Sequence, residues 1–144
     1  MWVQLLTAFL GAMGFAILYH IRGIRLWAAS LGGLLSWGFY LWVEHLGGSV
    51  LIVNILAAAF SAAYAEVLAR ILKSPATIFV IPAVIPLVPG GALYYAMYSA
   101  VTGDAAALSR YSYETWNAAM GIAIGIAGVT SVCHLLAVRR RKRT

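Results

Sequence analysis

The sequence predicts an all-α polytopic membrane protein with five transmembrane helices, the fourth of which is broken by prolines and glycines. The 144 residues are 63% hydrophobic and only 10% charged, which is a membrane composition rather than a soluble one. Five apolar segments are long enough to cross about 30 Å of hydrocarbon, which needs roughly 20 helical residues. We expect a single transmembrane domain over 1–144, with helices at about 2–20, 26–46, 49–72, 76–101 and 116–138 and a basic cytoplasmic tail at 139–144.

Charge alternates between the connections that join these segments. Basic residues occur in every second connection, at Arg22 and Arg25, at Arg70 and Lys73, and again in the tail. Because cytoplasmic loops carry the excess of Lys and Arg, we expect the N-terminus outside the cell and the C-terminus in the cytoplasm. No basic region precedes the first apolar run, so we expect the first span to be retained rather than cleaved as a signal peptide.

Glycines mark the first and the last spans. Small residues four positions apart let helices approach closely in lipid, where no hydrophobic drive acts between them. We favour ordinary helix packing, because glycine is common in membrane helices, and a moving interface or a subunit contact is the alternative. The residues are Gly11 and Gly14 in the first span and Gly121, Gly125 and Gly128 in the last, where Gly121 and Gly125 form a pair with this spacing.

Aromatic residues in the second span fall toward its ends or at helical spacing. They are Trp27, Trp37, Tyr40 and Trp42. Trp and Tyr are enriched where a helix meets the membrane interface. We therefore expect them to be interfacial anchors or lipid-facing bulk, and they imply no cofactor.

The third span carries an acidic side chain at membrane depth. Glu66 precedes Leu72, near the expected end of the span, by six residues, or roughly 9 Å at about 1.5 Å per residue. Arg70 follows four residues later on the same helix face, in the favourable order for an ion pair. Two interpretations stay open. Arg70 neutralises Glu66 while it reaches the headgroups, or Glu66 carries protons or positions charge near a substrate.

The fourth span contains the main anomaly of the sequence. Ser74 and Pro75 begin it as a helix cap and a first-turn proline, which makes the preceding connection short. Breakers then occur where a crossing helix should be most regular, and each interior proline strands the carbonyl four residues earlier. The breakers are Pro82, Pro86, Pro89, Gly90 and Gly91, and the stranded carbonyls belong to Ile78, Pro82 and Ile85.

We expect two half-helices, or a re-entrant stretch, to meet within 86–91 and to form a binding site. Lipid cannot satisfy freed carbonyls, so protein, water or ligand must reach them. Gly90 and Gly91 permit positive φ and leave their amides open to close approach. Such a bend offers acceptors for an ammonium group and donors for a carboxylate, as a zwitterionic amino acid requires. The alternative is a kinked structural helix covered by its neighbours, and Tyr94 then belongs to the outer aromatic belt rather than to the site.

The remaining segments carry few chemical signals. Residues 102–115 are expected to form a short polar loop outside the membrane. His134 in the last span is expected either to relay protons or simply to pack. Cys133 is the single cysteine, which rules out an internal disulfide. No catalytic triad, metal-ligand spacing or phosphate loop is present in the sequence, so we expect no enzyme activity, metal, cofactor or nucleic-acid partner.

Three short segments resemble the signature of the threonine/serine exporter family. They are 66–70 (Glu-Val-Leu-Ala-Arg), 95–97 (Tyr-Ala-Met) and 73–91 (Lys-Ser-Pro-Ala-Thr-Ile-Phe-Val-Ile-Pro-Ala-Val-Ile-Pro-Leu-Val-Pro-Gly-Gly). The chain is most similar to the small, stand-alone, C-terminal-type half of these transporters. It departs from the family pattern at Ala83, where glycine is common, and at residues 19–22, which replace a proline-containing helix end.

The resemblance implies a subunit of a secondary active exporter in the inner membrane. It implies small amino acids, threonine and serine, as substrates, or a small carboxylate such as succinate, with proton coupling as our hypothesis. It also implies a larger partner subunit that carries the other membrane half, and it leaves open whether a homo-oligomer replaces that partner. The two halves would be inserted in opposite orientations, as in inverted-repeat transporters. The alternative function is a non-transporting scaffold or assembly subunit.

Overall fold

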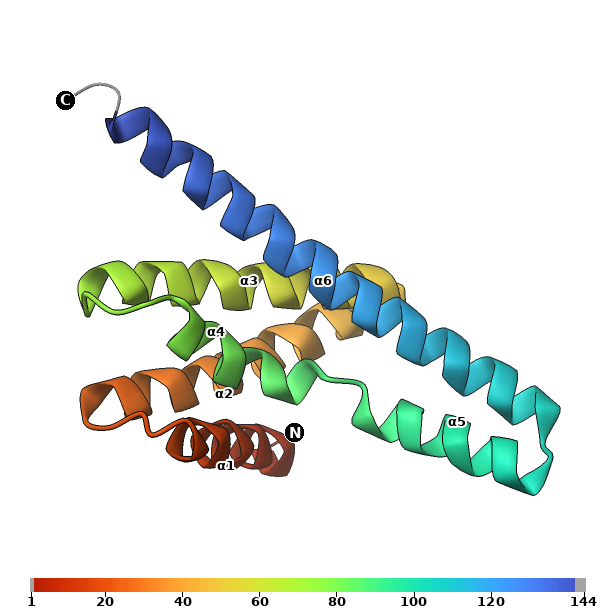
Figure 1. Cartoon of the computed structure of the whole chain (residues 1–144). Coiled ribbons are helices and arrows are strands. Elements are labelled where there is room, and N and C mark those ends of the chain that lie inside the picture. The colour runs from red at the N-terminus through yellow and green to blue at the C-terminus, as the bar shows by residue number, and fades with distance from the viewer. Residues whose placement is uncertain (1, 142–144) are drawn as a thin grey trace.

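The chain folds into α-helices joined by short connections, in a computed structural model that describes residues 2–141 and the side chains of residues 2–136 (Figure 1). No strand occurs within 2–141, so the predicted all-α class is confirmed. The elements are α1 (Trp2–Leu18), α2 (Ile24–His45), α3 (Val50–Ile71), α4 (Thr77–Val84), the 3₁₀ turn η1 (Ile85–Leu87), α5 (Gly90–Thr102) and α6 (Ala105–Arg141).

Helix α2 lies at the centre of the bundle and contacts α1, α3, α4 and η1. Small residues make these close contacts possible. A Cβ atom built on Gly33 would collide with the side chain of Ala12 in α1, and one on Gly32 would lie 2.9 Å from the Tyr64 ring in α3. Ala12 and Ala16 are fully buried on the facing side of α1. Close backbone approach thus replaces large side chains as the basis of this core, as is usual between membrane helices.

Two polar contacts join α2 to α3 inside the bundle. The hydroxyl oxygens of Ser36 and Ser61 lie 2.6 Å apart, and both residues are fully buried. The Tyr64 hydroxyl donates to the carbonyl oxygen of Ala28 at 2.8 Å. Such bonds satisfy polar groups that lipid would leave unpaired.

The long helix α6 crosses α3 through the predicted glycine pair. Built Cβ atoms would lie 2.8 Å from the Leu51 carbonyl oxygen at Gly121 and 2.9 Å from the Ala58 Cβ at Gly125. At Gly128, three residues further along, nothing lies within 4 Å. The first two glycines therefore make a helix contact within the chain, as ordinary packing predicts, whereas the third faces open space.

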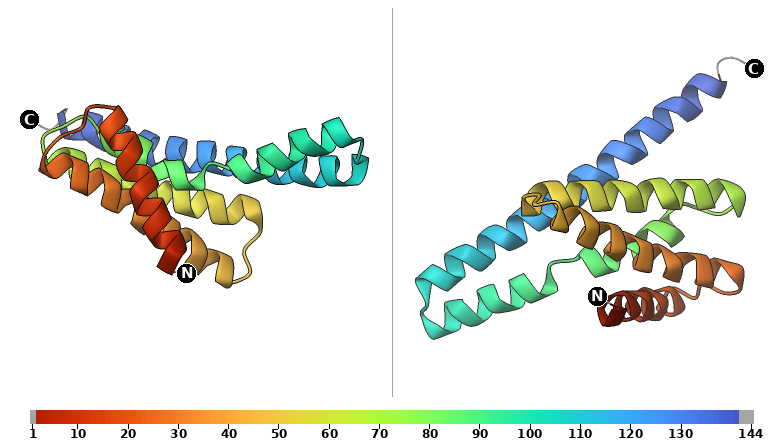
Figure 2. Two further views of the ribbon diagram at one scale, coloured as in Figure 1. Left: turned by 90° about the horizontal axis from the view of Figure 1, so that it is seen from below. Right: turned by 180° about the vertical axis from the view of Figure 1, so that it is seen from behind.

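The hairpin of α5 and the first half of α6 projects away from the other helices (Figures 1 and 2). Gly103 ends α5 with φ 78°, and the Asp104 carboxylate accepts a hydrogen bond of 3.0 Å from the Ala107 amide at the start of α6. Along the hairpin, the Tyr95 and Tyr111 rings stack with their centroids 5.3 Å apart. The turn between the two helices is therefore short and well defined.

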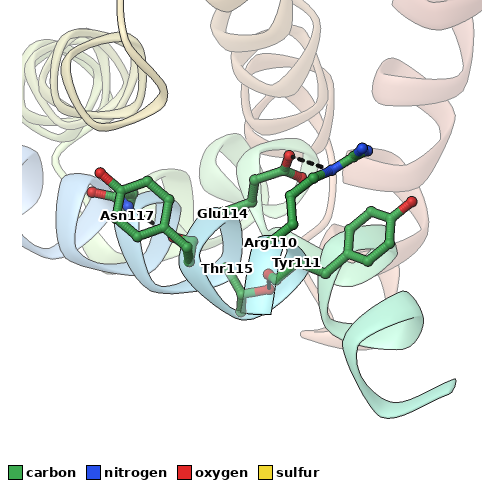
Figure 3. Close-up of polar contacts among 6 residues, drawn as sticks. Arg110, Tyr111, Glu114, Thr115 and Asn117 are labelled. Atoms are coloured by element: carbon green, nitrogen blue, oxygen red, sulfur yellow. Dashed lines mark hydrogen bonds and ion pairs between the residues drawn. The ribbon is translucent and has the colours of Figure 1, made fainter. Parts of the chain in front are cut away.

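The predicted polar loop at 102–115 is wrong from Ala105 onward, because α6 begins there. The polar side chains in this stretch support a helix instead. Arg110 and Glu114 form an ion pair of 3.6 Å one turn apart, and Thr115 donates to the Tyr111 carbonyl oxygen at 2.8 Å (Figure 3). Pairs with this spacing stabilise helices. The helical backbone is therefore interrupted only at Gly103 and Asp104, between α5 and α6.

Three helices in the described part of the chain are long and apolar enough to cross a membrane, namely α2, α3 and α6. A fourth span is added if α4, η1 and α5 together count as one bent crossing. Helix α1 is apolar but has only 17 residues, or about 25 Å at about 1.5 Å per residue. The predicted total of five spans is therefore not confirmed, and a crossing by α1 stays a prediction.

Candidate functional site

The fourth predicted span is broken at its prolines, as the sequence predicts. The axes of Thr77–Leu87 and Gly90–Thr102 differ by 50°. Pro82 lies inside α4, Pro86 lies in the 3₁₀ turn, and Pro89 is the residue before α5. Proline cannot donate a backbone hydrogen bond, so three prolines so close together interrupt the regular ladder. The broken segment, α4–η1–α5, is the candidate site.

Local contacts satisfy part of the backbone that the sequence leaves free. The Ile85 carbonyl oxygen accepts from the Val88 amide at 3.2 Å, and the Gly90 amide donates to the Val88 carbonyl oxygen at 2.8 Å. The Pro82 carbonyl oxygen is covered by α2, because it lies 3.4 Å from the Cβ position of Gly33. The expectation of an open Gly90 amide and a free Ile85 carbonyl is therefore wrong.

Gly90 and Gly91 do not adopt the positive φ that glycine permits. Within residues 2–141, the glycines with positive φ are Gly23, Gly47 and Gly103. Gly90 and Gly91 instead form the first turn of α5, where the backbone is already helical. Both face open space, since a Cβ on either would meet nothing within 4 Å.

A pocket of about 290 Å³ opens where the break meets α1 and α2. Its walls come from three elements that are distant in the sequence, and none of its side chains is charged. The lining residues are Gln4, Thr7, Ala8, Gly11, Trp37, Ile85 and Pro86. Of the residues predicted for the site, Pro86 lies in this wall.

Trp37 contributes an unusual donor to this region. Its indole Nε1 atom is buried and has no hydrogen-bond partner in the part of the chain that the structure describes. The ring stacks on Tyr40 with the centroids 4.9 Å apart. An unpaired buried donor costs about 1–3 kcal/mol. Trp37 is half-buried and packs against the cluster of Ala57, Ala58 and Leu87, so the expected role as an anchor or lipid-facing residue is wrong.

The other predicted site residues lie elsewhere. Gly90, Gly91 and Tyr94 are exposed on α5, and the Tyr94 ring meets Tyr95 edge to face with the centroids 5.4 Å apart. Pro82 is buried in α4. The structure thus assigns no shared cavity to these residues, and their roles in a site stay predictions.

The predicted charged pair forms on α3. The Arg70 guanidinium lies 3.8 Å from the Glu66 carboxylate, with the Glu66 side chain 23% exposed and that of Arg70 59% exposed. Neither residue lines the pocket at Pro86. His134 is exposed on α6. A role for Glu66, Arg70 or His134 in transport would therefore act at a distance from this pocket.

Sequence reasoning missed the wall of the pocket that α1 and Trp37 provide. The available signal was the spacing of Gln4, Thr7 and Gly11, which places the two polar side chains and a glycine on one helix face. Trp37 likewise follows the buried Gly33 by four residues, so both lie on one face of α2. These signals do not identify which helices pack against one another, so the pocket could be recognised only in the folded structure.

One protein family matches most of the part of the chain that the structure describes. The model of the family described as "Threonine/Serine exporter, ThrE" matches residues 4–132, from α1 through the broken segment into α6. No curated protein and no solved structure matches the chain significantly. This family consists of transporters. The long helices of this chain are apolar enough to cross a membrane, which agrees with that assignment. The resemblance at residues 66–97 is therefore confirmed, and the chain belongs to the threonine/serine exporter family.

Proposed function

We propose that this chain is the small membrane subunit of a secondary active exporter for threonine and serine, with the broken segment α4–η1–α5 at its transport site. The pocket against Pro86 carries this proposal, because it lies at the break and inside the region that the family matches. Transporters of this general kind bind substrate where discontinuous helices interrupt the membrane core.

The size of the pocket suits a small solute. Pockets for drug-sized ligands measure about 300–1,000 Å³, and the one at Pro86 measures about 290 Å³. A small amino acid or a short dicarboxylate such as succinate fits this volume. Both substrate classes therefore belong to the proposal, with threonine and serine as the primary one.

We further propose that export is proton-coupled and that Glu66 contributes to the coupling. Its carboxylate lies on α3, 3.8 Å from the guanidinium of Arg70. Carboxylates inside membrane segments are costly, and they commonly serve proton or ion pathways. Because Glu66 is outside the pocket, it would couple through the motion of α3 rather than through contact with substrate.

The proposed orientation places the N-terminus outside and the C-terminus in the cytoplasm of the inner membrane. The α1–α2 and α3–α4 connections lie at the same end of the bundle in all three views (Figures 1 and 2). These connections carry Arg22 and Lys73, with Arg25 and Arg70 in the adjoining helix turns. The positive-inside rule assigns such an end to the cytoplasm.

We also propose a larger partner subunit that supplies the other membrane half. Helix α6 is the least buried of the three long apolar helices, and the α5–α6 hairpin stands clear of the other helices. Lipid together with a second membrane half would cover these surfaces. A second copy of this chain is the alternative occupant.

Export by cells tests the proposal. Cells without their own exporter for these amino acids would express the chain alone or with a candidate larger subunit, and loss of preloaded threonine, serine and succinate would be measured. Pro86→Ala is expected to lower the export rate by about tenfold or more, by straightening the break. Pro75→Ala is the matched control, because Pro75 is exposed before α4 and is expected to leave the rate within about twofold.

Two outcomes would contradict the proposal. Absence of export by the wild-type chain, with and without the larger subunit, would remove the transport function. Normal export by Pro86→Ala, together with poorer recovery of the complex, would favour the scaffold function instead.

A further inference from the structure

The α1 wall of the pocket has chemistry that the broken segment lacks. Gln4, Thr7 and Gly11 line it at spacings of three and four residues, so they share one face of α1. The Gln4 amide offers two donors and an acceptor. The Thr7 hydroxyl donates to the Gln4 carbonyl oxygen at 2.9 Å, which leaves its own oxygen able to accept. This wall therefore presents both donors and acceptors to the pocket.

The α2 wall adds one further donor. The buried Trp37 Nε1 has no acceptor among the described residues, and Trp37 lines the same pocket. The nitrogen itself is covered, so a ligand acceptor would reach it only after the indole turns toward the pocket, and that hydrogen bond would relieve the cost of the unpaired donor. The donor thus favours a ligand with a carboxylate or carbonyl oxygen.

The pocket is electrically neutral, which distinguishes between the two proposed substrate classes. None of its lining residues is charged. A dicarboxylate would place two negative charges against walls that hold no cation, which is unfavourable. A zwitterion has no net charge, and its ammonium and carboxylate groups match the acceptors and donors of the two walls.

We propose that Gln4 and Thr7 of α1, together with Trp37 of α2, bind the zwitterionic amino acid against Pro86 and select it over a dicarboxylate. This inference rests on the proposed function for its substrate class. Gln4 and Thr7 accept from the ammonium group, while the Gln4 amide and the Trp37 indole donate to the carboxylate. Gly11 leaves the space that the ligand occupies.

Two glycines of α1 provide a matched test of this site. A Cβ on Gly11 or on Gly14 would meet nothing within 4 Å, and of the two only Gly11 lines the pocket. Both Gly11→Leu and Gly14→Leu should raise helix propensity by roughly 1 kcal/mol, so neither is expected to disturb folding. Serine binding would be measured by titration calorimetry on the purified full chain, in complex with its larger subunit if recovery requires it.

We expect Gly11→Leu to weaken serine binding by about tenfold or more by filling the pocket, and Gly14→Leu to leave it unchanged. Gln4→Leu and Trp37→Phe should weaken it by about five- to tenfold each, because each removes a hydrogen-bonding group. These two variants keep the test valid if Gly11→Leu is not recovered in folded form. Gln4→Arg should shift the preference toward succinate, since it places a cation in a neutral pocket.

Equal serine binding by wild type, Gly11→Leu and Gln4→Leu would overturn the inference, as would undetectable binding by the wild type. These results are separable from the proposed function. Export that is lost in Pro86→Ala but normal in Gln4→Leu and Gly11→Leu supports an exporter whose site lies elsewhere. Serine binding with the expected pattern but without export would instead contradict the exporter proposal and support the pocket.

Discussion

Ser36 and Ser61 illustrate how single polar groups hold the bundle together. The Ser61 hydroxyl lies 2.6 Å from that of Ser36 and 2.7 Å from the Ala57 carbonyl oxygen. A hydroxyl has one hydrogen, so Ser36 donates to Ser61 while Ser61 donates to the carbonyl. The two serines are thus chemically unequal although they form one contact between α2 and α3.

This inequality predicts different costs for the two alanine substitutions. Ser61→Ala leaves the buried Ser36 hydroxyl without its partner and should lower stability by about 1–3 kcal/mol. Ser36→Ala leaves Ser61 bonded within α3 and should cost about 0.5–1.5 kcal/mol. Thermal unfolding of the purified variants in detergent would measure the difference. Equal losses would show that the direction of donation assigned here is wrong.

A structural role of Glu66 and a role in proton coupling can be distinguished by experiment. The chain contains a second ion pair with the same spacing, Arg110 and Glu114, on the projecting hairpin (Figure 3). Glu114→Gln therefore provides a control for Glu66→Gln. Both substitutions remove one carboxylate from an arginine one helix turn away.

If Glu66 couples export to protons, Glu66→Gln should flatten the pH dependence of threonine export while serine binding stays normal. Glu114→Gln should keep the wild-type pH profile, because its exposed pair contributes at most about 1 kcal/mol. Export rates at several pH values in proteoliposomes would decide. A wild-type profile for Glu66→Gln would leave the pair with a structural role alone.

At the scale of elements, α6 and α3 depend on two glycines for their contact. The Gly125 position lies beside the backbone of α3, with the Ala58 Cβ 2.9 Å from the place of a built Cβ. One turn further, the space around Gly128 is open. The same substitution should therefore have opposite consequences at these neighbouring sites.

Gly125→Leu is expected to force the helices apart and to destabilise the chain by about 1–3 kcal/mol, as overpacking does. Gly128→Leu should be neutral or slightly stabilising, since leucine has the higher helix propensity by about 0.8–1.0 kcal/mol. Yield and thermal unfolding in detergent would compare them. Destabilisation by both substitutions would indicate that Gly128 meets another subunit or chain segment in the membrane.

At the scale of the whole molecule, the basic connections share one end of the bundle while the α5–α6 hairpin extends away from it (Figures 1 and 2). Helix α6 has 37 residues, or about 55 Å at about 1.5 Å per residue. That length exceeds a hydrocarbon core of about 30 Å. The helix must therefore tilt strongly or extend into the headgroup region.

The proposed orientation predicts which positions a membrane-impermeant thiol reagent reaches. On a Cys133→Ser background, His45→Cys should be labelled in intact spheroplasts, because the α2–α3 connection is expected outside. Arg22→Cys should be labelled only after permeabilisation. Both side chains are exposed, so accessibility reports the membrane side rather than burial. The reverse pattern would overturn the orientation and, with it, the inverted-repeat arrangement of two halves.

Some features follow from the chain by itself because they depend on local chemistry. The prolines at 82, 86 and 89 remove donors wherever they stand, so a break in the fourth span was predictable. The membrane class follows from apolar length, and the Glu66–Arg70 pair follows from helix spacing. The family signature at 66–97 is likewise a property of the sequence, and the match over 4–132 confirms it.

Other features were decided only by tertiary structure. The pocket at Pro86 forms where α1, α2 and η1 meet. The sequence around Gln4 or Trp37 does not indicate that these elements are neighbours. The surroundings of the Pro82 carbonyl were equally non-local, since Gly33 of α2 packs over it, whereas the Ile85 carbonyl is satisfied locally by the Val88 amide. The physical reason is that a proline determines which hydrogen bonds are lost nearby, whereas close approach between distant helices determines which of the freed groups are covered and where a cavity stays open.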